Sequence, residues 1–148
     1  MISEVTGDLF TSGLPALSHG CNCRGVMGGG IAADFRRRWP RMYREYRLRC
    51  EQGLFVPGSV MMWSTPVTVF NLGTQLDPGP DASLTAIGKS VARMTAVASL
   101  LDIPVIGMPR IGCGIGGLDW DDVYRKIAAS CFPRVDLVVY SLPVPEVS

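Results

Sequence analysis

Two glycine-rich segments contain the residues of this chain that are best suited to binding a phosphate. The first is NCRGVMGGGI, residues 22–31, and the second is RIGCGIGG, residues 110–117. Each follows an apolar run typical of a strand and precedes residues of helical character. Glycines at such a junction leave backbone amides free to converge on a phosphate, with the positive end of the next helix behind them. Two such segments predict a site that holds one pyrophosphate from both sides; the alternative is a pair of tight turns.

Two better-known phosphate motifs do not fit this chain. Residues 112–117 match G-x-G-x-x-G, and Asp136 falls near the distance expected for a ribose contact. A Rossmann fold, however, carries this motif on its first strand and needs several strand–helix units after it, whereas one helix and one strand follow here. Residues 88–90, GKS, resemble the end of a P-loop, but Ser83 occupies the place of the required earlier glycine.

Length and composition predict a single folded domain over residues 1–148. The chain is 47% hydrophobic, and its mean hydropathy is +0.24, which excludes a disordered chain. No apolar run approaches the roughly 18 residues of a membrane span. The N-terminal sequence MISEVTGDLF lacks the basic and apolar regions of a secretion signal. We therefore expect a monomer in the cytoplasm, without membrane contact.

The five cysteines do not form a regular framework. They are Cys21, Cys23, Cys50, Cys113 and Cys131, and an odd count without regular spacing argues against disulfides. The only histidine, His19, lies close to Cys21 and Cys23, but this set is too crowded for the usual tetrahedral zinc site. We expect small buried thiols, and neither a metal nor a cofactor.

Positive charge is concentrated in residues 35–50, FRRRWPRMYREYRLRC, which hold seven arginines and one acid, Glu45. Arg37, Arg41 and Arg44 are expected to share one helical face, with Tyr43 and Tyr46 nearby. One interpretation is a solvated helix face. The other is contact with the phosphates of a nucleic acid or a nucleotide-modified partner.

The elements that must position the glycine segments alternate along the chain. Apolar spacing, the cap Ser83 and the helix-starting Pro40 predict several helices, and Asp119 is expected to cap the last one. The predicted strands are 1–5, 14–21, 59–63, 68–71, 105–108 and 135–141, with a break at Thr65-Pro66; the predicted helices are 31–39, one from 40, one from 84, and 120–129. This alternation predicts a layered α/β domain with a largely parallel or mixed sheet.

Four motifs, in order and at suitable separations, give the chain a resemblance to the macrodomain, the ADP-ribose-binding module. They are GDLF at 7–10, Asn22 followed by MGGGIA at 27–32, MPRIGCG at 108–114, and VYSL at 139–142. The resemblance covers residues 7–142 and implies a three-layer α/β/α fold with a mixed, largely parallel central sheet. The branch it most resembles holds terminal ADP-ribose–protein glycohydrolase and the DNA ADP-ribosyl glycohydrolase antitoxins, the latter through GIGGLDW at 114–120.

The resemblance implies a role for each motif. Asp8 would accept a hydrogen bond from the adenine amino group, the Leu9 amide would contact the ring, and Tyr140 would lie beside it. Asn22 and the following amides would hold the distal ribose and one phosphate, and the second segment would close over the other. Without the resemblance, Asp8 is explained equally well as a turn residue, and Tyr140 is explained better as a residue of the core. The implied ligand-binding residues are Asp8, Leu9, Asn22, Met27, Gly28, Gly29, Gly30, Ile31, Arg110, Ile111, Gly112, Cys113, Gly114, Ile115, Gly116, Gly117 and Tyr140.

The chain departs from these relatives at their catalytic residues. They place a lysine shortly after the fourth strand, where this chain has Gln75 or a neighbour, and no lysine occurs before Lys89. A neutral amide cannot form a Schiff base. The protein glycohydrolase also has an aspartate two residues after its GCG element, and Gly116 stands there instead.

Two functions are compatible with these departures. The first is hydrolysis by a water that the substrate's own phosphate activates, with Asn22 as the candidate catalytic residue that orients the ribose. Labile esters of ADP-ribose with Asp or Glu on a protein are then the favoured substrates. The second is an ADP-ribose-binding module without turnover, for ADP-ribose or a related nucleotide metabolite. The expected partners are ADP-ribose, ADP-ribosylated protein and, as an alternative, ADP-ribosylated nucleic acid.

Overall fold

The computed structural model describes residues 1–64 and 66–142. Residue 65, at the predicted break between two strands, lies outside the described residues, as does the end of the predicted single domain, 143–148. Within the described part of the chain, no helix combines the length and apolar character needed to cross a membrane.

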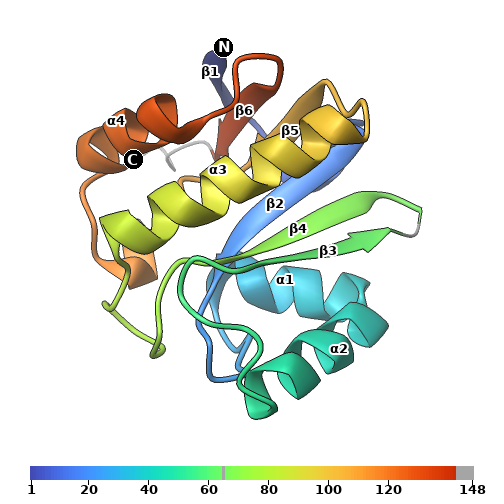
Figure 1. Ribbon diagram of the computed structural model, residues 1–148, viewed down its shortest axis with the longest axis vertical. Coiled ribbons are helices and arrows are strands. Elements are labelled where there is room, and N and C mark those ends of the chain that lie inside the picture. The colour runs from blue at the N-terminus through green and yellow to red at the C-terminus, as the bar shows by residue number, and fades with distance from the viewer. Residues whose placement is uncertain (65, 143–148) are drawn as a thin grey trace, which may run out of the picture.

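A six-stranded sheet forms the centre of the fold (Figure 1). Its strand order is β1-β6-β5-β2-β4-β3, and β3 runs antiparallel to β4 while all other neighbours are parallel. The strands are β1 (Ile2–Thr6), β2 (Ala16–Cys21), β3 (Val60–Ser64), β4 (Thr68–Gly73), β5 (Val105–Met108) and β6 (Asp136–Ser141). The predicted mixed, largely parallel sheet is confirmed.

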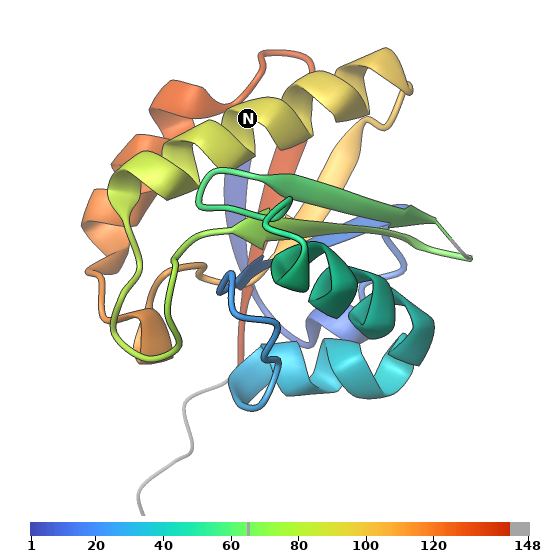
Figure 2. The same cartoon turned by 60° about the horizontal axis from the view of Figure 1, so that its bottom comes forward.

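Helices cover both faces of this sheet, which gives three layers (Figure 2). One face carries α3 (Leu84–Leu100) and α4 (Trp120–Ser130), and the other carries α1 (Gly30–Arg38) and α2 (Pro40–Glu51). Each interface has its own apolar core. Ile87, Val91 and Ile127 are fully buried in the first, and Phe35 and Met42 in the second.

The helix starts follow from local sequence. The Ser83 side chain accepts a hydrogen bond from the Ala86 amide, as an N-cap should. Asp119 does occupy the N-cap position of α4, but its side chain makes no cap hydrogen bond, so that part of the prediction is wrong.

The expected single face for the arginines is also wrong. Trp39, which has a non-helical backbone (φ −129°, ψ 72°) before a proline, separates α1 from α2, because Pro40 has no N–H to continue the first helix. Arg37 therefore lies on α1, where it pairs with Asp34, while Arg41 and Arg44 lie on α2.

Parallel strands bring three connecting segments to one edge of the sheet. Segments 22–29, 74–83 and 109–119 follow β2, β4 and β5, which are adjacent and parallel. The third includes the short 3-10 helix η2 (Gly114–Gly116); another, η1 (Leu9–Thr11), follows β1. Both glycine-rich segments thus lie at the carboxyl ends of neighbouring strands, the usual place for a ligand in such sheets.

His19 lies at the centre of the fold. It is fully buried in β2, stacks on Phe35 with ring centroids 3.9 Å apart, and places Nε2 2.7 Å from Asn71 Oδ1. Burial lowers the pKa of His19 from 6.5 to about 4, although the Asn71 hydrogen bond opposes this shift. Within the described ranges, no group of three or more His, Cys, Asp or Glu side chains is placed to hold a metal ion.

The buried imidazole should stay neutral in the folded protein down to about pH 4. The unfolded chain binds the proton first as the pH falls below 6.5, so this group's stabilisation is full above pH 6.5 and declines toward pH 4. The loss over this window is about 3 kcal/mol. Because His19 is the only histidine, one NMR imidazole signal reports it; a folded-state titration near pH 6.5 would contradict the assignment.

Candidate functional site

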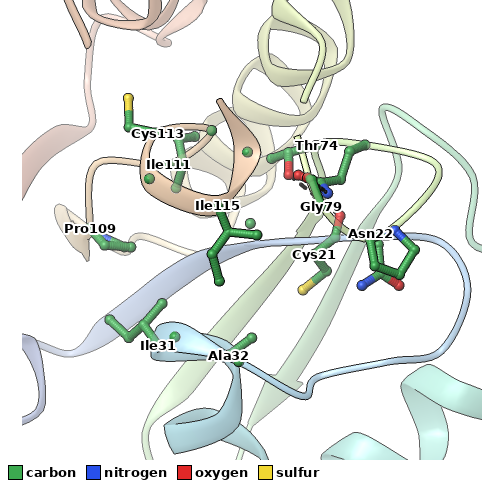
Figure 3. A pocket seen from close by; sticks show the side chains of 18 of the residues that line it. Cys21, Asn22, Ile31, Ala32, Thr74, Gly79, Pro109, Ile111, Cys113 and Ile115 are labelled. Atoms are coloured by element: carbon green, nitrogen blue, oxygen red, sulfur yellow. Dashed lines mark hydrogen bonds between the residues drawn. The ribbon is translucent and has the colours of Figure 1, made fainter. Parts of the chain in front are cut away.

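A cavity of about 690 Å³ lies at the carboxyl edge of the sheet (Figure 3). It is bounded by the two predicted glycine-rich segments, which we call the first loop (22–31) and the second loop (110–117), and by residues that follow β4. The structure therefore brings the two predicted loops together around one space. The lining residues are Gly20, Cys21, Asn22, Val26, Gly28, Gly29, Gly30, Ile31, Ala32, Thr74, Gln75, Pro78, Gly79 and 109–116.

The Asn22 side chain organises the first loop. Its Oδ1 accepts hydrogen bonds from the backbone amides of Arg24 (3.0 Å) and Val26 (3.4 Å), and it lies 3.0 Å from the Tyr46 hydroxyl. Its Nδ2 donates to the Val26 carbonyl at 2.7 Å. The amide oxygen is thus occupied by the protein, and only the second Nδ2 hydrogen can serve a ligand.

Helix α2 supports the first loop from behind. The Tyr46 hydroxyl also lies 2.7 Å from the Asn22 carbonyl, and the Tyr43 hydroxyl donates to the Gly25 carbonyl at 3.0 Å. Burial raises the pKa of Tyr46 well above its usual range, so this hydroxyl remains a hydrogen-bond donor. Met27, predicted as a ligand contact, is 1% exposed and packs beneath the loop instead of lining the cavity.

The end of the first loop offers backbone donors to the cavity. Gly29 is the N-cap of α1 and provides no side-chain cap, so the first amides of this helix have no partner from that residue. Side chains added at Gly28 or Gly29 would meet only one neighbour each, Val26 at 3.5 Å and Ile115 at 3.4 Å. A helix N-terminus with open space in front can bind an anion.

Glycines of the second loop meet different requirements. Gly112, Gly114 and Gly117 have φ of +75°, +64° and +83°, a conformation that side chains disfavour. A Cβ at Gly112 would lie 2.7 Å from Ile87 Cδ1, whereas one at Gly114 would meet nothing within 4 Å. Gly112 is therefore needed for packing, while Gly114 stands free.

Ile115 connects the two loops across the cavity. Its side chain is 59% exposed, and its Cδ1 lies 3.4 Å from the positions that Cβ atoms would take at Gly29 and Gly30. Figure 3 shows it reaching from the second loop toward the first. A ligand between the loops would therefore lie beside this side chain.

The residues implied for adenine lie together at neighbouring strand ends, outside the cavity lining. Asp8 follows β1 and its Oδ1 accepts a hydrogen bond from the Phe10 amide at 2.9 Å, so it does serve as a turn residue. Leu9 is 3% exposed. The half-buried Tyr140 ring lies 3.7 Å from the Cβ position of Gly7. This corner adjoins the second loop, because β6 is next to β5.

Charge in the cavity is sparse. Of the described lining residues, Arg110 alone carries a charge, and its guanidinium lies 3.5 Å from Glu4 and over the Trp120 ring. Burial raises the pKa of Cys21 and of Cys113, so both thiols stay protonated. The described lining thus offers backbone amides for an anion but neither a side-chain base nor an activated nucleophile.

Of the third wall of the cavity, the sequence indicates only Gln75. Thr74, Gln75, Pro78 and Gly79 line it, although the sequence shows only a loop there. The place of this loop in the chain could have indicated it, because the loop follows β4, which is adjacent to β2 in the sheet. Gln75, the predicted replacement of the relatives' lysine, is 9% exposed.

Comparisons with known proteins agree with this geometry. The family model described as Macro domain matches residues 18–127. DNA ADP-ribosyl glycohydrolase of Mycobacterium tuberculosis is 33% identical over 147 residues, covering 95% of this chain and 42% of the relative. ADP-ribose 1''-phosphate phosphatase of Candida albicans is 30% identical over 138 residues, covering 82% and 88%. This chain thus spans less than half of the mycobacterial relative.

A solved structure shows the same architecture. The macrodomain of Mycobacterium tuberculosis DarG has a TM-score of 0.85 and 33% identity, covering 97% of this chain and 99% of that chain. Fold, loop placement and family model therefore agree over most of the described residues. The chain belongs to the macrodomain family.

Proposed function

We propose that this chain binds ADP-ribose and hydrolyses ADP-ribosyl linkages, foremost esters with Asp or Glu on a protein. The observation that carries the proposal is the convergence of two glycine-rich loops on one cavity of about 690 Å³. The relatives named above, a DNA ADP-ribosyl glycohydrolase and an ADP-ribose 1''-phosphate phosphatase, act on related compounds and support it.

In the proposed complex the diphosphate lies between the two loops. The amides at the start of α1 and those around Gly114 bind its oxygens, with Ile115 alongside. Adenine lies toward Asp8, Leu9 and Tyr140, and the distal ribose lies beside Asn22. This direction follows the strand order, in which β1 and β6 flank β5 on one side and β2 and β4 lie on the other.

Hydrolysis at this site relies on positioning. The described cavity lining provides no side-chain base, so the ligand's own phosphate accepts a proton from the water that attacks the anomeric carbon of the distal ribose. The bond from this carbon to the ester oxygen breaks, and the Asp or Glu carboxylate leaves. The remaining Nδ2 hydrogen of Asn22 orients the ribose for this attack. Such a route depends on orientation and fixed dipoles more than on a strong base, and it suits a labile ester.

One observation favours a second function, ADP-ribose binding without turnover. Gln75 lines the cavity, and Gln75 or a neighbour stands where the glycohydrolases that the chain resembles have a catalytic lysine. Its neutral amide can neither form a Schiff base nor supply a positive charge.

A turnover panel separates these functions. The substrates are protein carrying Glu-linked ADP-ribose, protein carrying Ser-linked ADP-ribose, and DNA-linked ADP-ribose, with release of free ADP-ribose as the readout. The hydrolase proposal predicts release from the Glu-linked substrate; no release from any of the three, with ADP-ribose binding in calorimetry, supports the binding module. NAD should bind much more weakly than ADP-ribose, and equal affinities would contradict both functions.

The arginine-bearing helices allow a separate prediction about nucleic acid. Arg37 pairs with Asp34, and the Arg36 and Arg38 guanidiniums lie over the rings of Tyr43 and Phe10, 4.3 and 4.2 Å from their centroids. Arg41 and Arg44 are exposed on α2. We expect these arginines to form a solvated face that contacts no phosphate. Added salt should then weaken the binding of ADP-ribosylated DNA and of free ADP-ribose to the same extent, and the variant Arg41→Gln/Arg44→Gln should behave like the wild type.

The control for this comparison is Arg125→Gln/Arg134→Gln, which removes the same charge from exposed positions on and after α4. If the α2 variant alone loses about one unit of salt slope per arginine on modified DNA, these arginines contact phosphates and the expectation is wrong.

A further inference from the structure

The loop between β4 and α3, residues 74–83, joins the two glycine-rich loops; we call it the bridging loop. Toward the first loop, the Cys23 amide donates to the Leu76 carbonyl at 2.9 Å, and Arg24 Nε lies 2.6 Å from Asp77 Oδ1. Toward the second loop, the Ala82 amide donates to the Gly116 carbonyl at 3.2 Å.

Glycines of the second loop make room for the bridging loop. A Cβ at Gly116 would lie 2.9 Å from the Ala82 Cβ, and one at Gly117 would lie 3.0 Å from the Pro80 Cβ. A side chain at either position would push the second loop away from the bridging loop. The spacing between the phosphate-binding loops therefore depends on the shape of the bridging loop.

Gln75 fixes that shape from inside. Its Nε2 donates two hydrogen bonds, to the carbonyls of Asp77 (2.7 Å) and Gly79 (2.9 Å). Its Oε1 lies 3.4 Å from the Cβ position of Gly116, so the side chain reaches the second loop as well. With 9% exposure, Gln75 makes these bonds largely away from water.

The side-chain ion pair between the bridging loop and the first loop is weaker than the Gln75 hydrogen bonds. The side chains of Arg24 and Asp77 are 55% and 53% exposed, and exposed ion pairs contribute little because water and salt screen them. Two hydrogen bonds from a nearly buried amide hold a loop more firmly, since breaking them leaves the buried Gln75 amide without a partner.

We propose that Gln75 is a positioning residue that sets the separation of the two glycine-rich loops and thereby the affinity for a diphosphate. This inference rests on the proposed function for the identity of the ligand, ADP-ribose. Gln75 acts through the bridging loop, and what it must supply is two hydrogen-bond donors. Methionine at this position fills similar volume without a donor, whereas a lysine ammonium keeps the donors.

The test compares Gln75→Met, Gln75→Lys and Gln52→Met. Gln52 is the only other glutamine and is exposed at the end of α2, so it is the matched control. Calorimetry measures the affinity for ADP-ribose, which spans both loops, and for AMP, whose single phosphate reaches one. Hydrogen exchange of the amides in both loops, without ligand, reports loop order independently of the charge that lysine adds.

Gln75→Met should weaken ADP-ribose binding about tenfold or more, about 1.4 kcal/mol, and leave AMP binding within about twofold. It should also speed amide exchange in both loops, and Gln75→Lys should restore slow exchange. The inference is overturned if Gln75→Met binds ADP-ribose like Gln52→Met, if both ligands weaken equally, or if Gln75→Lys exchanges as fast as Gln75→Met. A wild-type protein that fails to bind ADP-ribose overturns the proposed function instead.

Discussion

Glutamate at position 114 should abolish ADP-ribose binding while the protein stays folded. Gly114 lines the cavity and a Cβ there meets nothing within 4 Å, so the new side chain fits without a clash and brings a charge that repels the diphosphate. We expect affinity to fall about 100-fold or more, equivalent to about 2.7 kcal/mol. Because φ is +64°, the substitution also costs about 1–3 kcal/mol of folding free energy. Calorimetry and thermal unfolding measure the two effects separately.

Gly53→Glu is the matched control for this variant. Gly53 has φ of +71°, has nothing within 4 Å of its Cβ position, and lies after α2, away from the cavity. Backbone strain and added charge are therefore the same in both variants. Equal ADP-ribose affinities in Gly114→Glu and Gly53→Glu would show that the second loop does not contact the ligand.

Replacing Asn22 with alanine should remove binding and turnover together. Four hydrogen bonds involve the Asn22 side chain, to Arg24, to Val26 twice, and to Tyr46, and together they shape the first loop. Without them the loop amides lose their common direction. We expect ADP-ribose affinity to fall about 100-fold, about 2.7 kcal/mol, and hydrolysis to fall at least as far.

Tyr46→Phe separates loop shape from ligand contact. It removes one buried hydroxyl behind the loop, leaves Asn22 in place, and should destabilise the fold by about 1–3 kcal/mol with a smaller loss of affinity. Tyr124→Phe, on the partly exposed α4, is the control and should change neither quantity. If Asn22→Ala binds ADP-ribose normally but releases none, Asn22 acts on the reaction alone.

The fold could be predicted where local sequence determines local structure. Ser83 before an apolar helical stripe gave the start of α3, and Pro40 gave the start of α2. The glycine-rich loops could be predicted from their glycines between a strand and a helix. They lie together because the strands before residues 22–31 and 110–117 are neighbours that end at the same edge of the sheet.

The supports of the cavity could not be predicted, because they are contacts between distant parts of the chain. Tyr43 and Tyr46 stand among exposed arginines in the sequence. The local sequence does not indicate that their hydroxyls bond to carbonyls about twenty residues earlier in the chain. Gln75 was noticed as a missing lysine, while its two hydrogen bonds depend on how residues 76–79 turn back over it. Position 112 requires a glycine because Ile87 of α3 packs against it.

Eight of the described residues that line the cavity are glycines, so main chain forms much of its wall, and this limits how the protein can change under selection. A codon change replaces a side chain, but the amides at the start of α1 and around Gly114 stay with every residue except proline, which has no N–H. An inhibitor that bonds only to these amides would therefore offer few routes to resistance at the contact itself. Escape would require either a side chain that fills the space, as at Gly114, or a change at Asn22, Tyr46 or Gln75, which shape the loops. Either change would damage the binding of the natural ligand as well.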